Sequence, residues 1–177
     1  MSRSGGSLLD LPVLRYLLYA VLLLGNPVPA LAGEPFAATV TKVIDGDSLV
    51  IEVKSRKMEI RLYGVDSPEF DQPFSGLAKA FSRRAVLGRQ VTVDPRYTDR
   101  YDRVVALVDR DGGVLNADLV SAGFAWVSPR YCRLSLCREW RELEKLARSK
   151  RAGLWQEADP VPPWRWKEMS RERSWRK

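Results

Sequence analysis

Residues 39–63 of the chain read TVTKVIDGDSLVIEVKSRKMEIRLY, and this stretch decides the fold class. It contains three apolar-rich runs with the composition and partial alternation of half-buried β-strands. Short polar turns separate the runs, and the first turn, Asp45-Gly46-Asp47, has the Asp-Gly sequence that β-hairpins favour. The stretch therefore predicts a hairpin followed by a third strand, at residues 39–44, 48–53 and 58–63.

The chain beyond this stretch predicts helices and two further strands. Ser75 is a good capping residue, and we expect it to start a helix that Gly88 ends. Asn116 is expected to cap a shorter helix that ends at Gly123. Residues 65–73 contain two prolines and are expected to form a loop. The helix that starts at Ser75 is predicted to cover residues 75–87. A further helix is predicted at residues 136–151, and strands at residues 90–94 and 104–108.

Five short strands with a helix after the third predict an α+β domain with a mainly β core. The expected architecture is a five-stranded OB-fold barrel with three helices packed at one end. The chain has 177 residues, of which 45% are hydrophobic, so it can bury one core of ordinary size and carry extra segments at its ends.

The chain contains no histidine, and this excludes several kinds of active site. Serine–histidine triads, histidine-dependent nucleases and zinc sites that need imidazole are ruled out. Catalysis is then expected from carboxylates, arginine, lysine and hydroxyl groups, with a hard, oxygen-seeking cation as a suitable metal. The net charge of +7 suits a polyanionic partner such as nucleic acid, or an anionic surface.

The N-terminal residues 1–32 have the pattern of a secretory signal peptide. A short polar start precedes an apolar run and the small residues Ala30 and Ala32, after which cleavage would leave Gly33 first. The alternative is an uncleaved anchor, although the apolar run is shorter than the about 20 residues of a spanning helix. We expect an exported protein, periplasmic or extracellular, with residues 33–36 as a short lead into the domain.

In an exported chain, the neighbouring cysteines Cys132 and Cys137 are predicted to form a local disulfide between a loop and the start of a helix. A catalytic thiol is disfavoured because the chain has no histidine to activate it.

The C-terminal residues 157–177 form a tail rich in proline, tryptophan and arginine. Its basic residues and tryptophans could contact the phosphates and bases of nucleic acid, or an anionic surface. The alternative is a solvated appendage that folds back on the domain.

Two later stretches carry the residues best suited to chemistry. Arg61–Glu69, RLYGVDSPE, places one cation and two carboxylates at the end of a strand and in the loop that leaves it. Asp99–Arg103, DRYDR, lies in the polar loop between the fourth and fifth predicted strands. Loops on a rigid barrel are common positions for active sites, although a surface salt bridge between Arg61 and Glu69 is the structural alternative.

These two stretches and the Asp45-Gly46-Asp47 turn together resemble the staphylococcal nuclease (thermonuclease) family. The family pattern is an Asp-Gly-Asp hairpin, an Arg-x-x-x-Val-Asp-Thr-Pro-Glu segment and a later Asp-[Lys/Arg]-Tyr-x-Arg loop. This chain has Ser67 where threonine is usual. The resemblance covers residues 37–156, which we take as the domain.

The resemblance implies a calcium site and a phosphate-binding pair. Asp47 and Asp66 correspond to the calcium-binding carboxylates, and the Ser67 carbonyl to a further ligand, in keeping with the preference of Ca²⁺ for oxygen donors. Arg61 and Arg103 correspond to the arginines that bind the scissile phosphate.

The resemblance further implies that Glu69 orients or deprotonates the attacking water, and that Arg100 and Tyr101 contact the nucleic acid. The chain departs from the family in one place that concerns Glu69. Its loop from Glu69 to Ala78 is shorter than in the staphylococcal enzyme and lacks the lysine-rich character of that loop.

The function implied is that of a secreted Ca²⁺-dependent nuclease. It would hydrolyse the phosphodiester bonds of DNA and RNA, leave 3′-phosphate ends, and act as a monomer without a stable protein partner. One alternative is a noncatalytic nucleic-acid-binding module on the same barrel. Another is a cell-envelope interaction protein that acts through its basic, tryptophan-rich tail.

Overall fold

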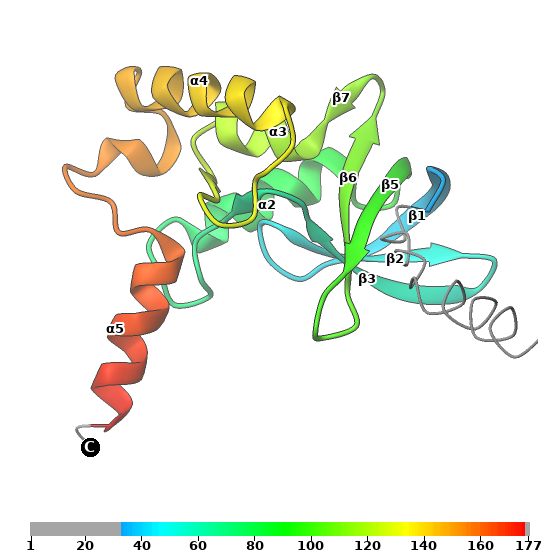
Figure 1. The fold of residues 1–177 in the computed structure, drawn as a ribbon, viewed down its shortest axis with the longest axis horizontal. Coiled ribbons are helices and arrows are strands. Elements are labelled where there is room, and N and C mark those ends of the chain that lie inside the picture. Colours follow the sequence, from blue (N-terminus) through cyan, green and yellow to red (C-terminus); the bar gives the residue numbers. More distant parts are fainter. Residues whose placement is uncertain (1–32, 176–177) are drawn as a thin grey trace, which may run out of the picture. The chain divides into compact units, whose positions relative to one another are not determined.

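The computed structural model describes residues 33–175 (Figure 1). The predicted signal peptide, residues 1–32, lies outside the described residues. In the part of the chain that is described, no helix combines the length and the apolar character needed to cross a membrane.

The described chain is built on a closed barrel of five strands, in the spatial order β3-β2-β1-β5-β6. Neighbouring strands run antiparallel except for β3 and β6, whose parallel pairing closes the barrel. This confirms the predicted α+β class and the OB-fold barrel. The strands are β1 (Phe36–Val43), β2 (Ser48–Val53), β3 (Arg56–Leu62), β5 (Gln90–Thr98) and β6 (Val104–Arg110).

The hydrophobic core fills the barrel because alternate strand residues point inward. Leu49, Ile51 and Ile60 are fully buried, and β2 and β3 pair Leu49 with Ile60. Arg61 lies between the buried Ile60 and Leu62, so its side chain points away from the core. The alternation thus places a cation on the outer face of the strand that closes the barrel.

Three helices pack around the barrel: α2 (Ser75–Val86), α3 (Leu115–Ser121) and α4 (Leu136–Ser149). Gly88 and Gly123 follow the first two helices with φ of 75° and 73°, values that favour glycine and that confirm these predicted ends.

The predicted helix caps were wrong. Ser75 is the first residue of α2 rather than its cap, and its hydroxyl donates to the Phe70 carbonyl at 3.0 Å. Asn116 lies inside α3, fully buried, where its amide donates to the Tyr63 carbonyl at 2.9 Å and accepts from the Val108 N–H at 3.2 Å. A buried amide must satisfy its polar groups, and here it joins α3 to the barrel.

The predicted loop at residues 65–73 begins instead with a short strand, β4 (Val65–Asp66). β4 pairs antiparallel with β8 (Trp126–Val127), and Asp66 lies opposite Trp126. Two further short elements are β7 (Gly113–Val114) and the 3-10 helix η2 (Gly153–Gln156). The β4–β8 pairing holds Asp66 in a fixed direction beside the end of β3.

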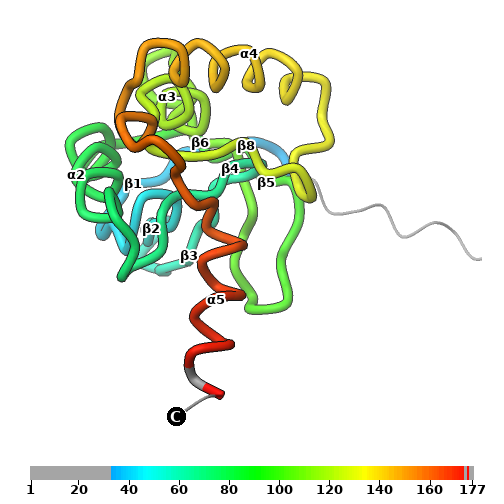
Figure 2. Tube along the Cα trace, turned by 90° about the vertical axis from the view of Figure 1, so that its left-hand side faces the viewer, coloured from blue at the N-terminus to red at the C-terminus, as the bar shows by residue number. Residues whose placement is uncertain are grey.

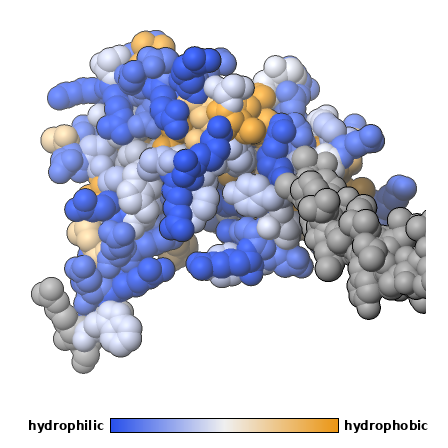
Figure 3. Space-filling view, in the orientation of Figure 1, coloured by the Kyte–Doolittle hydropathy of each residue, from blue (hydrophilic) through white to orange (hydrophobic). Residues whose placement is uncertain are grey.

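The described residues contain a fourth helix that the sequence did not predict, α5 (Pro163–Trp175). Pro163 occupies its first position, where the missing N–H costs nothing. The segment has no apolar stripe at helical spacing, which is why its helix was not expected. The face of α5 seen in Figure 3 is largely hydrophilic.

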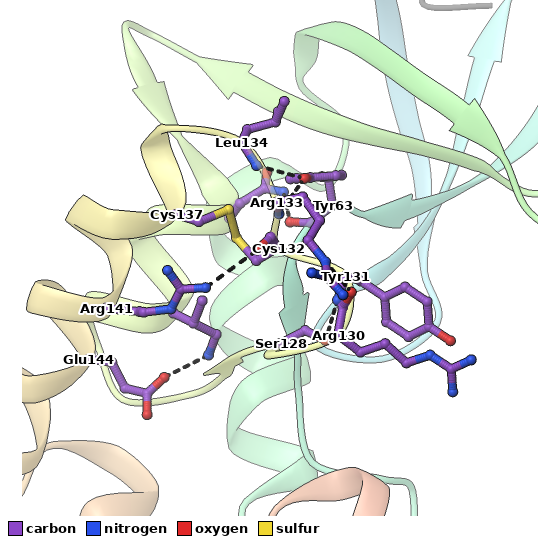
Figure 4. Close-up of a disulfide and its surroundings, with 12 residues drawn as sticks. Tyr63, Ser128, Arg130, Tyr131, Cys132, Arg133, Leu134, Cys137, Arg141 and Glu144 are labelled. Atoms are coloured by element: carbon purple, nitrogen blue, oxygen red, sulfur yellow. Dashed lines mark hydrogen bonds between the residues drawn. A yellow bond between two sulfur atoms is a disulfide. The ribbon is translucent and has the colours of Figure 1, made fainter. Parts of the chain in front are cut away.

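The predicted disulfide between Cys132 and Cys137 is present, with Cα atoms 5.7 Å apart (Figure 4). It closes the loop between β8 and α4. The Tyr63 hydroxyl, at the end of β3, accepts hydrogen bonds from the main-chain N–H groups of Arg133 at 2.8 Å and Leu134 at 3.2 Å. The disulfide loop is therefore fastened to the strand that carries Arg61.

Candidate active site

The Asp45-Gly46-Asp47 turn points one carboxylate into the protein. The Asp45 side chain accepts the Asp47 N–H at 3.0 Å, a local bond that shapes the turn. The Asp47 side chain is only 1% exposed and accepts the Ser67 N–H at 2.6 Å. The hairpin is therefore tied to the chain just after β4.

Arg61 joins the two carboxylates that were predicted to bind calcium. Its guanidinium pairs with Asp47 through one terminal nitrogen and with Asp66, at 2.5 Å, through the other. The second nitrogen also donates to the Val65 carbonyl at 3.3 Å. Three separate segments of the chain thus meet at one planar cation. The structural alternative, a surface pair between Arg61 and Glu69, is not among the ion pairs of the described residues.

The charge of this cluster suits a divalent cation. Asp47 and Asp66 carry two negative charges, and Arg61 carries one positive charge. The Ser67 N–H donates to the Asp47 carboxylate, so the Ser67 peptide lies beside this cluster. The two carboxylates and the Ser67 carbonyl would offer an ion only oxygen ligands, which Ca²⁺ prefers. The described residues hold no group of three or more His, Cys, Asp or Glu side chains placed around a common metal position, so a calcium ion here would need the main-chain carbonyl and water as well.

Glu69 follows this cluster in the loop before α2. Its main-chain N–H donates to the Gln72 side-chain oxygen at 3.1 Å, and its carbonyl accepts the Gln72 N–H at 2.9 Å. The Glu69 carboxylate, 28% exposed, pairs at 2.7 Å with Lys167 of α5. Glu69, the predicted general base, is therefore held by Lys167 of the C-terminal segment, a contact that the sequence did not indicate.

Arg103 lies beside Arg61 on the outer face of the barrel. β3 and β6 pair Arg61 with Val105, two residues after Arg103, and the Arg103 guanidinium lies 3.8 Å from the Glu59 carboxylate. Glu59 and Arg61 lie two apart on β3 and share a face, so this contact brings the Arg103 guanidinium to the face that carries Arg61. This arrangement suits two donors that bind one phosphate.

The β5–β6 loop holds Arg103 through Asp99. The Arg103 Nε and terminal nitrogen donate to one Asp99 oxygen at 2.9 and 2.8 Å. Burial raises the pKa of Asp99, but the hydrogen bond from Arg103, the main-chain N–H groups of Tyr101 and Arg103, and the charge of Arg103 together outweigh it and lower the pKa below 3.8. Asp99 therefore stays ionised and fixes the direction of Arg103.

Arg100 and Tyr101, the residues predicted to contact nucleic acid, lie at the tip of this loop. Tyr101 is 64% exposed, and the guanidinium carbons of Arg100 and Arg103 lie 4.8 and 5.4 Å from its ring centre. An exposed ring supported by two cations is suited to stacking on a base next to bound phosphate.

Two aromatic residues near the site, Tyr97 and Phe70, were not predicted from the sequence as site residues. Tyr97 packs edge-on against Tyr63, with ring centres 6.5 Å apart. Burial raises the pKa of Tyr97, and the neighbouring Tyr63, Tyr131 and Asp99 raise it further, while Arg61 lowers it. Phe70, directly after Glu69, is 96% exposed. In the sequence, a large apolar residue directly after the charged Glu69 was the feature that could have indicated an exposed aromatic side chain at the site.

The residues of this cluster lie largely within a stretch that matches a known family. The family model described as Staphylococcal nuclease homologue matches residues 59–157, which include Arg61, Asp66, Glu69 and Arg103. The chain belongs to the staphylococcal nuclease family. As a member it is a nuclease, an enzyme of the hydrolase class.

Relatives of this staphylococcal nuclease homologue come from several bacteria. An uncharacterized endonuclease of Escherichia coli is 36% identical over 129 residues, or 72% of this chain and 82% of the relative. The micrococcal nuclease of Shigella flexneri is 32% identical over 170 residues, or 91% and 95% of the two chains. Protein ParB of Escherichia coli is 34% identical over 164 residues, or 87% and 89%.

Proposed function

We propose that this family member is a Ca²⁺-dependent nuclease that hydrolyses phosphodiester bonds of DNA and RNA and leaves 3′-phosphate ends. The observation that carries the proposal is the meeting of Asp47, Arg61 and Asp66, which come from the β1–β2 turn, β3 and β4. Glu69 lies in the loop after β4, and Arg103 is the last residue of the β5–β6 loop.

The arginines are proposed to bind the scissile phosphate. Their guanidinium groups offer several N–H donors in a fixed plane, and these donors stabilise the negative charge that grows on phosphate oxygens as water adds. Arg103 is already oriented by Asp99. Arg61 must exchange part of its bonding to Asp47 and Asp66 for the phosphate, and a cation bound by those carboxylates would favour the exchange.

Glu69 is proposed to take the proton from the attacking water. The water oxygen bonds to phosphorus, the bond from phosphorus to the 5′ oxygen breaks, and the leaving 5′ oxygen takes a proton from solvent water while Glu69 releases the one it accepted. The phosphate then remains on the 3′ side. Bound Ca²⁺ would supply positive charge that polarises the phosphate and the water.

Asp47, Asp66 and the Ser67 carbonyl are the proposed ligands of that ion. The proposal also includes export of the chain, with residues 1–32 as its signal peptide, and action as a monomer. Sequencing the N-terminus of protein recovered from its native compartment tests export, because cleavage after Ala32 leaves Gly33 first. A retained Met1 would contradict cleavage.

The proposal is tested by digesting labelled single-stranded DNA and RNA with the purified chain, in millimolar calcium or in chelator, and by identifying the end that keeps the phosphate. We expect cleavage only with calcium, and 3′-phosphate ends. Glu69→Gln and Arg61→Ala are expected to lower kcat by about 100-fold or more. Lys145→Met, which removes a surface pair with Glu142 on α4, serves as the control.

A noncatalytic binding module would retain DNA in a gel-shift experiment and cleave nothing, in either the wild type or the variants. Cleavage that continues in chelator would overturn the calcium part of the proposal. An envelope interaction protein would bind anionic vesicles and show no calcium-dependent cleavage of either nucleic acid.

A further inference from the structure

The start of α5 and the residues before it contact the loop that carries Glu69 at three points. Lys167 pairs with the Glu69 carboxylate at 2.7 Å. The Trp166 indole N–H donates to the Asp71 carboxylate at 2.8 Å. The Val161 carbonyl accepts the Gln72 amide N–H at 2.5 Å. Three residues of the loop, Glu69, Asp71 and Gln72, are thus bonded to the C-terminal segment.

Gln72 connects the main chain of Glu69 to this segment. It is 6% exposed, and its amide oxygen accepts the Glu69 N–H while its amide nitrogen donates to the Val161 carbonyl. A buried amide with both ends bonded resists rotation, because turning it would leave polar groups unpaired. Both the main chain and the side chain of Glu69 are therefore fastened to residues 161–167.

The C-terminal segment is itself anchored to the domain. Trp164 packs, partly buried, against a small hydrophobic cluster that includes Trp126, Leu154 and Trp155. Trp126 lies opposite Asp66 in the β4–β8 pair. The start of α5 thus packs beside the β4–β8 pair, which positions Asp66, a proposed calcium ligand. Because the loop is bonded to the same C-terminal segment, the position of Glu69 is linked to that of Asp66.

We propose that α5 is part of the active site and that Lys167 is a positioning residue for Glu69. The inference rests on the proposed function, in which Glu69 acts on water. The ammonium group of Lys167 binds one oxygen of the carboxylate, Oε1, which leaves the other oxygen available to accept a proton. An anchored helix supplies the order that a short exposed loop lacks by itself.

The same helix could act in two other ways, and these predict different kinetics. If Lys167 bound a substrate phosphate, its loss would raise KM and leave kcat unchanged. If Lys167 masked Glu69, its loss would raise kcat. Positioning alone predicts a lower kcat with KM nearly constant, because a misplaced base slows the chemical step without weakening binding.

The test measures kcat and KM on a labelled oligonucleotide in calcium for Lys167→Met, Lys167→Arg, Glu69→Gln and the double variant. We expect Lys167→Met to lower kcat by about 10- to 100-fold with KM within about twofold. Lys167→Arg should recover most of the loss, since it restores a cation. In the Glu69→Gln background, Lys167→Met should have no further effect, because the two residues act as one unit.

Lys145→Met is the matched control, since Lys145 pairs with Glu142 at 2.8 Å on α4, away from the loop. An equal loss of kcat in this control, an unchanged kcat in Lys167→Met, or either alternative pattern described above would overturn the inference. An inactive wild type or a fully active Glu69→Gln would instead refute the proposed function. Thermal melting of each variant checks folding, which an ion pair this exposed affects little.

Discussion

At the scale of single residues, Asp47 is the group on which the predicted calcium site most depends. It is buried, it pairs with Arg61, and it accepts the Ser67 N–H at 2.6 Å. The carboxylate therefore connects three segments, and an ion bound there would stabilise the folded protein by an amount that rises with the logarithm of the ion concentration relative to Kd.

We predict that calcium stabilises the wild type against heat and that Asp47→Asn removes most of this effect. At a calcium concentration 100 times Kd, the added stability is about 2.7 kcal/mol. Calorimetry with calcium or chelator measures it. Asp118→Asn is the control, because Asp118 pairs with Arg110 at 3.1 Å in a different cluster. An equal rise of Tm in the Asp47 variant would contradict the assignment.

The second prediction at this scale concerns the pH dependence of stability through Asp99. Its folded pKa is below the ordinary 3.8, so between these two values the unfolded chain binds more protons than the folded one. The contribution of Asp99 to stability therefore rises with pH through this window, is complete above about pH 5, and is lost as pH falls through the folded pKa.

Asp99→Asn should remove this contribution. The free energies of unfolding of wild type and variant, from urea titrations between pH 2 and pH 7, are expected to differ at neutral pH and to converge in acid. Curves that stay parallel throughout would show that the hydrogen bonds from Arg103 do not act through the charge of Asp99.

At the scale of elements, the β1–β2 turn approaches α2 and the chain after β4 very closely. A Cβ on Gly46 would lie 2.6 Å from the Ser67 Oγ and 2.9 Å from the Ala78 Cβ. Ser82 of α2 also donates its hydroxyl to the Gly46 carbonyl at 2.5 Å. The glycine allows the turn to sit deep enough for Asp47 to reach Arg61.

We therefore predict that Gly46→Ala costs about 1–3 kcal/mol of stability and lowers kcat, because the turn must move outward. Gly76→Ala on α2 is the matched control, since a Cβ there would meet nothing within 4 Å. Chemical denaturation and oligonucleotide cleavage measure the two effects. If Gly46→Ala and Gly76→Ala changed stability and kcat by the same amounts, the close approach of the β1–β2 turn would not be important for either property.

At the scale of the whole described domain, two projections that carry basic residues extend in the same direction. In both views α5 and the β5–β6 loop extend in the same direction from the strands (Figures 1 and 2). The loop carries Arg100 and Arg103, and the α5 helix carries Lys167. Nucleic acid that reaches the Asp47–Arg61 cluster would meet positive charge from the loop.

We predict that KM rises with salt while kcat changes little, because binding releases counterions from the phosphates. Arg100→Ala should reduce the slope of log KM against log salt by about 0.7, the value for one phosphate contact on a single strand. Lys145→Ala should leave the slope unchanged. A slope unaffected by Arg100→Ala would place the substrate elsewhere.

The sequence by itself determined what depends on neighbouring residues. The bounds of β2, predicted as 48–53, are those found, because the pattern of apolar residues and the turn chemistry are local. The disulfide was predictable for the same reason, since Cys132 and Cys137 are five positions apart. The motif of Arg61–Glu69 indicated the family and its chemistry, although the roles assigned to its residues stay predictions.

Only the tertiary structure decided which distant groups meet. The parallel β3–β6 pair places Arg61 beside Arg103, and Trp166 bonds to Asp71 across 95 positions of sequence. Asn116 matches a capping residue in the sequence, but its amide instead joins α3 to the barrel, through Tyr63 and Val108. The physical reason is common to these cases: the packing of distant segments decides which polar groups come within reach of one another, and local sequence carries no record of those partners.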